Sequence, residues 1–415
     1  MTDLLEEAAA GHGVVSAFQR VVSLPSETVV GYEALARWPQ LDGPSPAHVF
    51  ARAVNSGHLD ALDHACITAA ASGALAGNSS DGMLLMVNCE PTAADIDLTL
   101  NVALAEAART FRVVFELTER GLLTDPGALL RKVDMLRSLG FLIALDDIGA
   151  HRDSLALLDI VAPDIVKLDL GLVQNQPDQI QARTVAAVMA HHERTGALIV
   201  AEGIETDEHL EQAIAYGATM GQGYRFGHPG ELDIAPDVSG IPAWERATPE
   251  RGNGSVFDLA TVGLKTRVVR KRTLLELSRH IERLAETAES APIVLTTLQQ
   301  HGNFDLRTRR RYTAIAERSP LVLVFGVGVP DDLEPEIRWV DIAADDPLST
   351  EWTIVVLGPH TAAALVAQER TPPRVANGAS SDGERRFEAA ITFDRGRVTR
   401  AARTLMARLA PHTRK

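Results

Sequence analysis

Polar and charged side chains recur where short apolar runs of this sequence end. The runs are rich in β-branched residues, which indicates strands. These strand-end residues are Glu33, Asn88, Glu116, Asp146, Asp147, Lys167, Asp169, Glu202 and Gln222. Carboxylates that converge at one edge of a sheet repel one another by several kcal/mol unless cations lie between them. The pattern therefore predicts a metal site.

The types of the candidate ligands select the metal. They are carboxylates and one amide carbonyl, and no His or Cys stands at these positions. Hard oxygen ligands favour Mg²⁺, Mn²⁺ or Ca²⁺ over Zn²⁺.

The adjacent pair Asp146–Asp147 is the most informative part of the pattern. Neighbouring side chains of a strand point to opposite faces. Both can reach the same site only if the strand ends there and the backbone turns, which Gly149 permits. One Asp could then bridge two ions about 3.5–4 Å apart, a spacing used in phosphoryl hydrolysis.

The elements that must position these residues alternate between strands and helices from Val30 to Gly223. Alternation of this kind implies parallel strands joined by helical crossovers. Close to eight strand–helix units in this length favour an α/β fold of the (β/α)8 barrel type, in which catalytic residues gather at the carboxyl ends of the strands. A doubly wound open sheet is the alternative, because periodicity alone does not separate the two folds.

The alternation stops in a Pro- and Gly-rich stretch after Pro229, which reads as a linker. A smaller mixed α/β domain is expected beyond it, beginning with the helical pattern RTLLELSRHIERLAETA. We therefore expect a barrel domain over 1–232, a linker over 233–254 and a second domain over 255–415. The basic clusters 265–272 and 307–311 are interpreted as a solvated face or an interdomain contact rather than a nucleic-acid site.

Composition narrows the functional classes. The chain has 415 residues, of which 46% are hydrophobic and 23% charged, and its formal net charge is −15. An acidic chain does not favour DNA as a partner. Two cysteines and an N-terminus without an apolar leader fit a cytoplasmic protein, and no apolar run is long enough for a membrane segment.

These segments, in this order, resemble the EAL-domain family of bacterial phosphodiesterases that cleave cyclic di-GMP. The signature stands as Glu33-Ala34-Leu35, with Arg37 two residues on, and the remaining segments are VNCEPT, FELTERG, LDDIGA, IVKLD, AEGIET and GQGYRFGHP. The resemblance spans about Gly13 to Pro229. It implies a modified TIM-type barrel with one antiparallel strand.

The resemblance also implies roles for single residues. Two ions, Mg²⁺ or Mn²⁺, would be held by Glu33, Asn88, Glu116, Asp146, Asp147 and Glu202. Lys167 and Glu202 would orient and deprotonate the attacking water, and the product would be linear pGpG. Substrate would be contacted by Gln19, Leu35, Arg37, Asp169, Glu205 and Gln222. Glu119 and Gly149 would anchor the loop that follows the aspartate pair.

That loop departs from the family pattern. Members with strong activity usually carry a loop resembling FGTGYSSL, whereas residues 148–155 here read IGAHRDSL. In the family this loop couples dimerisation to metal and substrate binding. The departure leaves open a second interpretation, a weak or inactive cyclic di-GMP receptor that signals through the second domain, and it bears on a possible homodimer.

The second domain resembles the DICT sensory domain, on the segments VGLKTRVVRKRTLLELSRHIE and FEAAITFDRGRVTRAARTLMARL. This resemblance implies that an unknown ligand or protein partner regulates the barrel. A third interpretation is a scaffold, in which the second domain binds a protein and the barrel only modulates that binding.

Overall fold

A computed structural model describes residues 2–41, 45–77, 81–118, 125–150, 154–232, 254–370 and 382–409. The chain folds as two compact units. We call the unit made of Met1–Ser154 and Val161–Ala247 the barrel unit, and the unit made of Leu155–Ile160 and Thr248–Lys415 the sheet unit. The expected linker lies, except for its last residue, outside the described residues.

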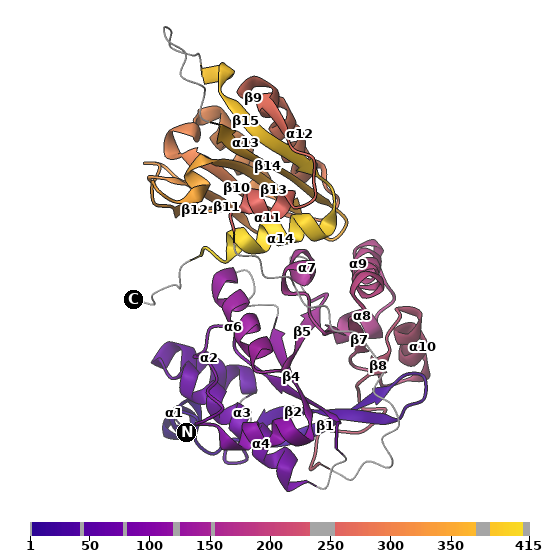
Figure 1. Ribbon diagram of the computed structural model, residues 1–415. Helices are drawn as coiled ribbons and strands as arrows, with labels where there is room; N and C mark the ends of the chain where they lie inside the picture. The colour runs from indigo at the N-terminus through magenta and orange to yellow at the C-terminus, as the bar shows by residue number, and fades with distance from the viewer. Residues whose placement is uncertain are drawn as a thin grey trace. The chain divides into compact units, whose positions relative to one another are not determined.

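Eight strands close a barrel in sequence order (Figure 1). β1 is antiparallel to both neighbours, β2 and β8, and all the other neighbouring strands are parallel. The closed barrel confirms the predicted fold class and excludes the open sheet. The strands are β1 Val15–Ser23, β2 Val29–Arg37, β3 Leu84–Asn88, β4 Arg112–Thr118, β5 Leu142–Ile148, β6 Ile165–Leu168, β7 Leu198–Ala201 and β8 Met220–Gly221.

Helices precede the first strand or connect the strands. Several begin at side chains that accept backbone N–H bonds, as at Asp178, where Gln181 completes a capping box. The helices are α1 Thr2–Ala9, α2 Pro46–Ser56, α3 Leu59–Ala76, α4 Val102–Thr110, α6 Pro126–Ser138, α7 Leu158–Val161, α8 Leu170–Gln174, α9 Gln179–Thr195 and α10 Asp207–Ala215, with a 3-10 turn at Ser154–Leu157.

The barrel interior is filled with apolar side chains from every strand, so it is a packed core rather than a pore. This cluster comprises Val21, Val30, Leu84, Met86, Val114, Ala144, Ile165, Leu198, Val200 and Met220, all of them buried. Its members on the parallel strands define the inward-facing register, because side chains two residues apart share a face.

The sheet unit has one seven-stranded sheet in the order β12-β11-β10-β13-β14-β15-β9. Its strands are β9 Arg267–Arg270, β10 Ile293–Gln300, β11 Val322–Val327, β12 Ile337–Asp341, β13 Glu351–Leu357, β14 Ala362–Arg370 and β15 Arg386–Thr392. Its helices are α11 Val256–Thr261, α12 Lys271–Thr287, α13 Leu306–Ala316 and α14 Arg395–Met406, with 3-10 turns at His301–Asn303, Pro347–Thr350 and Asp382–Glu384.

Helix α12 buries one face at helical spacing, through Leu274, Ser278, Ile281 and Ala285. This face and α13 share a core cluster with residues of β10 and β13. The sheet unit therefore has a hydrophobic core of its own. Among the described residues of the whole chain, no helix has both the length and the apolar content that a bilayer crossing requires.

Candidate active site

The strand register brings the predicted residues to one mouth of the barrel. On four strands a polar residue stands two positions beyond a member of the interior cluster, on the same face. The pairs are Met86 with Asn88, Val114 with Glu116, Ala144 with Asp146, and Ile165 with Lys167. Glu33 joins this face because it lies opposite Met86 in the β2–β3 register, and Gln19 lies opposite Glu33 in the β1–β2 register.

Lys167 lies at the centre of an acidic cluster and is almost fully buried. Its Nζ is 2.8 Å from Glu202 Oε1 and 2.9 Å from Glu116 Oε1. It is also 3.0 Å from Asp146 Oδ1 and 3.4 Å from Glu33 Oε2. One ammonium group thus contacts four carboxylates, so the cluster has fewer positive charges than carboxylates.

The pKa shifts of the cluster follow from its burial and from this charge imbalance. Burial, followed by the neighbouring charge of Glu33, raises the pKa of Glu116 well above its ordinary value. Burial also raises the pKa of Glu202 to about 8, and the charge of Lys167 offsets only part of that. Burial would lower the pKa of Lys167, but the carboxylates, Asp146 first, outweigh it and raise that pKa well above its ordinary value. Burial and mutual repulsion therefore favour the protonated form of Glu116 and Glu202, and cations that entered the cluster would favour the ionised form.

Asp147 reaches the same site by an unusual backbone conformation. Its φ is +56°, in the left-handed region, although β5 continues through Ile148. The β5–β6 register shifts between Leu145 and Ile148. The predicted turn is thus present, but it begins at Asp147 itself. A left-handed non-Gly residue costs about 1–3 kcal/mol and commonly marks a functional site.

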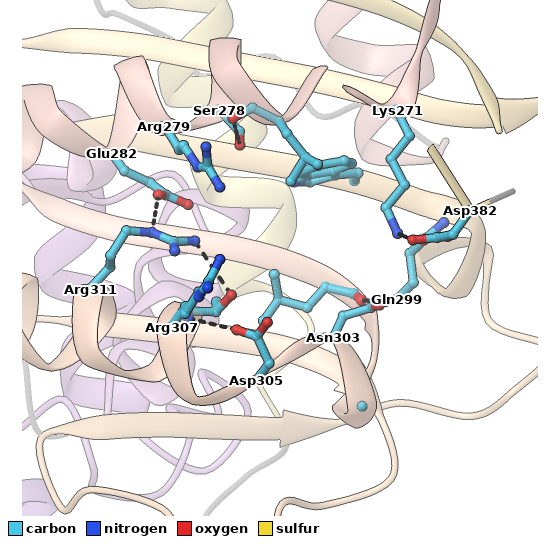
Figure 2. A pocket seen from close by; sticks show the side chains of 15 residues that line it. Lys271, Ser278, Arg279, Glu282, Gln299, Asn303, Asp305, Arg307, Arg311 and Asp382 are labelled. Carbon is cyan, nitrogen blue, oxygen red and sulfur yellow. Dashed lines mark hydrogen bonds and ion pairs between the residues drawn. The ribbon is translucent and has the colours of Figure 1, made fainter. Parts of the chain in front are cut away.

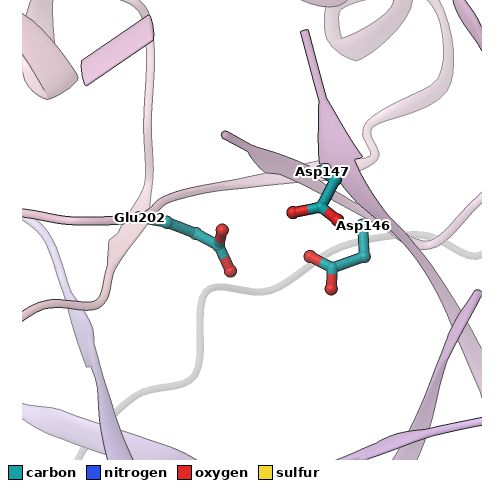
Figure 3. A group of neighbouring side chains, drawn as sticks. All are labelled: Asp146, Asp147 and Glu202. Carbon is teal, nitrogen blue, oxygen red and sulfur yellow. The ribbon is translucent and has the colours of Figure 1, made fainter. Parts of the chain in front are cut away.

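The turn brings three carboxylates together. Asp146, Asp147 and Glu202 each offer an oxygen, and these oxygens lie within 4.8 Å of one another (Figure 3). Glu116 Oε2 is buried without a hydrogen-bond partner among the described residues. Hard oxygen donors that are buried, close together and short of positive charge suit Mg²⁺, Mn²⁺ or Ca²⁺. The residues present therefore fit a divalent metal.

Amide side chains connect Glu33 to the neighbouring strands of the mouth. Gln222 Nε2 donates to Glu33 Oε2 at 2.7 Å and to Gln19 Oε1 at 3.1 Å. Asn88 Nδ2 donates to Glu33 Oε1 at 3.3 Å. Because of its charge contact with Lys167 and the Gln222 bond, the pKa of Glu33 is lowered in spite of its burial. Sequence spacing did not indicate this network.

Leu35 and Arg37 continue the inward face of β2 beyond Glu33, and both are half-buried. Arg37 Nη1 donates to the carbonyl of Ala36 at 2.9 Å. They therefore line the outer part of the mouth.

Two other predicted residues have local structural partners. The Asp169 side chain caps α8 by accepting from the N–H of Gly171 at 2.8 Å. Glu205 is exposed, and its backbone N–H donates to His209 Nδ1 at 3.3 Å. No described contact joins either side chain to the Lys167 cluster.

The loop beyond the aspartate pair is described in part. Gly149 has a φ of +110°, and a Cβ there would lie 2.4 Å from Leu172 Cδ1. Gly149 is therefore required both by its conformation and by its contact with α8. Glu119 and residues 151–153 lie outside the described residues.

Fold and site together define a class of protein. The barrel unit is a closed TIM-type barrel whose carboxylate-lined mouth lies at the carboxyl ends of its parallel strands. The family model described as EAL domain matches residues 3–229, more than half of the chain. The chain belongs to the EAL domain family. A second model, described as the sensory domain in diguanylate cyclases and two-component system (DICT), matches residues 255–370.

Curated relatives resemble the barrel unit. The probable cyclic di-GMP phosphodiesterase PdeG of Escherichia coli is 31% identical over 240 residues, which cover 55% of this chain and 46% of PdeG. The cyclic di-GMP phosphodiesterase RocR of Pseudomonas aeruginosa is 29% identical over 232 residues, covering 51% of this chain and 56% of RocR. The chain thus spans about half the length of these relatives.

Solved structures resemble the same part. BlrP1 of Klebsiella pneumoniae, in a complex with calcium and cyclic di-GMP, is 29% identical with a TM-score of 0.46, covering 53% of this chain and 57% of that one. A standalone EAL protein of Vibrio cholerae, bound to cyclic di-GMP, is 27% identical with a TM-score of 0.42, covering 55% and 95%.

Proposed function

We propose that the barrel unit hydrolyses cyclic di-GMP to linear pGpG with two Mg²⁺ or Mn²⁺ ions. The observation that carries the proposal is the cluster of Asp146, Asp147 and Glu202, with oxygens within 4.8 Å, next to a buried Lys167. The names of the relatives supply the substrate class.

The residues divide into two metal sites in this proposal. Glu33, Asn88, Glu116 and Asp146 would hold one ion, and Asp146, Asp147 and Glu202 would hold the other. Bound ions would lower the pKa of water and neutralise charge that develops on the phosphate. Lys167 neutralises and positions the carboxylates that it contacts.

Glu202 is the proposed general base. Burial raises the pKa of Glu202 to about 8 without metal, and ions bound beside it would keep its carboxylate ionised, in the form that takes a proton from water. The oxygen of that water attacks phosphorus and the bond from phosphorus to the 3′ oxygen breaks. The 3′ oxygen takes a proton from solvent and becomes a hydroxyl, so that pGpG keeps a 5′ phosphate. Arg37 would contact the phosphate, while Gln19, Leu35, Asp169, Glu205 and Gln222 would contact the rest of the substrate.

The decisive experiment measures pGpG formation from cyclic di-GMP by the purified chain with Mg²⁺, with Mn²⁺ and with chelator. We expect the parent chain to form pGpG only when metal is present. We expect Asp146→Ala to form none, although its barrel should still fold. The exposed side chain of Asp178 caps α9 through the N–H groups of Ile180 and Gln181 and has no described contact with the Lys167 cluster, so Asp178→Ala is expected to keep activity. Full turnover by Asp146→Ala, or turnover in chelator, would count against the proposal.

The altered loop at 148–155 favours one alternative, a receptor that binds cyclic di-GMP without turnover. Binding measured by calorimetry with no pGpG in any metal would support that alternative. We further propose that the segment 255–415 regulates the barrel, with domain boundaries at 232 and 255.

A further inference from the structure

The sheet unit contains a cavity of about 300 Å³ that the proposed hydrolysis does not use (Figure 2). Its walls come from α12, the end of β10, the first turns of α13, and β13. Small-molecule sites have volumes of about 300–1,000 Å³, so this cavity suits a small ligand.

The charged groups of the wall carry one more positive than negative charge, and Arg279 has its ion-pair partner, Glu276, outside the wall at 2.5 Å. Four cationic residues and three acids line the cavity: Lys271, Arg279, Arg307, Arg311, Glu282, Asp305 and Asp382. Figure 2 draws Arg279, Arg307 and Arg311 at one end and the Lys271–Asp382 pair at the other. This balance is positive, whereas the whole chain carries −15.

Each of the three acidic side chains already has a hydrogen-bond or ion-pair partner. Glu282 is buried and accepts from Arg311 Nε at 2.9 Å and from the hydroxyl of Tyr312 at 3.3 Å. Asp305 caps α13 by accepting from the N–H of Thr308 at 2.8 Å. Asp382 pairs with Lys271 Nζ at 2.5 Å.

Arg307 differs from the other cations. It is exposed at the start of α13 and forms no ion pair with any residue that the structure describes. Arg311 is held in place by Glu282, yet a guanidinium has five N–H groups, and the bonds to Glu282 and Thr308 use only two. Two arginines one helical turn apart therefore point donors at the cavity.

Ser278, Gln299, Asn303 and Thr308 add polar side chains to the wall, and the remainder is apolar or aromatic. Leu275, Leu298 and Trp352 contribute it, and Trp352 packs edge-on against Phe387 with ring centroids 5.9 Å apart. A flat apolar group would lie against this wall while an anionic group met the arginines.

The backbone of β10 is distorted at the same place. Gln299, which lines the cavity, has a φ of +63°, and the β10–β11 register shifts between Thr297 and Gln300. Arg385 and Glu369 bond its side-chain amide on either side. Bulges and left-handed residues recur beside binding sites, where they aim side chains.

We propose that this cavity binds a small aromatic anion. Its ring lies against Trp352, Leu275 and Leu298, and its carboxylate or phosphate is bound by Arg307 and Arg311. The basic cluster 307–311, interpreted from sequence as a solvated face or interdomain contact, in this proposal supplies the anion site.

The test is calorimetric titration of the full chain, in chelator, with benzoate, 4-hydroxybenzoate and phenyl phosphate. Benzamide reports the ring without the charge, and inorganic phosphate reports the charge without the ring. We expect at least one aromatic anion to bind more tightly than both. Comparing the affinities of the two carboxylates with that of phenyl phosphate shows which anionic group the site prefers.

Three variants locate the site. Arg307→Gln should weaken binding about tenfold, as expected for a lost charge-assisted hydrogen bond. Arg310→Gln, on the same helix but outside the cavity wall, should leave affinity within about twofold, as expected for an exposed charge. Leu275→Trp fills the cavity without changing charge and should abolish binding, with circular dichroism showing that the chain stays folded.

Three outcomes overturn the proposal: no aromatic anion binds at millimolar concentration, benzamide or inorganic phosphate binds as well as the anions, or Arg307→Gln and Arg310→Gln behave alike. Because chelator is present and no turnover is measured, each outcome is independent of hydrolysis at the barrel.

Discussion

At the scale of single residues, Lys167 acts as the internal cation of the acidic mouth. Lys167→Met removes the charge that four carboxylates share, and breaking a buried ion pair costs about 3–5 kcal/mol. We expect a lower free energy of unfolding in chelator, with much of the loss restored by Mn²⁺, because metal replaces the missing positive charge. Urea unfolding with and without Mn²⁺ measures this.

The matched control is Lys132→Met. Lys132 is equally buried, but it donates to the carbonyls of Ala93 and Ala94 rather than to the mouth. This variant should also lose stability, yet Mn²⁺ should add no more to it than to the parent chain. Equal metal effects in the two variants would contradict the role given to Lys167.

Asp63 of α3 gives a pH dependence outside the mouth. Burial raises its pKa to about 7, although the N–H of Glu90 donates to it at 2.9 Å. The folded state therefore holds a proton that the unfolded chain releases above its ordinary pKa near 4. Stability contributed by this proton is complete at pH 4 and is lost as pH rises to 7.

Asp63→Asn removes that titration. We expect the variant to gain up to about 4 kcal/mol relative to the parent chain between pH 4 and pH 8, an upper figure from a shift of about three pKa units. Denaturant unfolding at several pH values measures the gain. A difference between the two proteins that does not change with pH would refute the assignment.

At the scale of elements, the end of β5 depends on two left-handed residues, Asp147 and Gly149. Gly149→Ala adds a Cβ 2.4 Å from Leu172 of α8, in addition to the cost of the backbone conformation. Gly140 has a φ of +92° but open space around its Cβ position. We expect Gly140→Ala to cost about 1 kcal/mol and Gly149→Ala distinctly more. Thermal unfolding of both variants separates the two effects, because Gly140→Ala has only the backbone strain and Gly149→Ala also has the clash. Equal losses of stability would show that Leu172 moves aside without a cost in free energy.

At the scale of the whole molecule, two separate cores imply two unfolding transitions. The interior cluster of the barrel and the core shared by α12, α13 and the sheet have no member in common. We expect calorimetry to show a transition that Mn²⁺ raises and another that it leaves unchanged, because a ligand at 100 times its Kd stabilises only the unit it binds, by about 2.7 kcal/mol. A single transition, or equal shifts of both, would contradict this expectation.

The amino-acid sequence by itself determined the alternation of strands and helices and the residues that end each inward-facing strand, because these follow from local periodicity. Periodicity left the barrel and the open sheet undecided, and the closed order of the strands decided between them. The sequence also determined that any metal would meet oxygen ligands. Only the tertiary structure decided which side chains meet. Lys167 contacts carboxylates from four other strands or strand ends, Asp147 turns by a left-handed φ, and Asp169 caps a helix instead of joining the cluster. The cavity of the sheet unit was likewise beyond the sequence, since its wall joins residues from 271 to 382. Distances between residues far apart in the chain depend on packing, which periodicity does not encode.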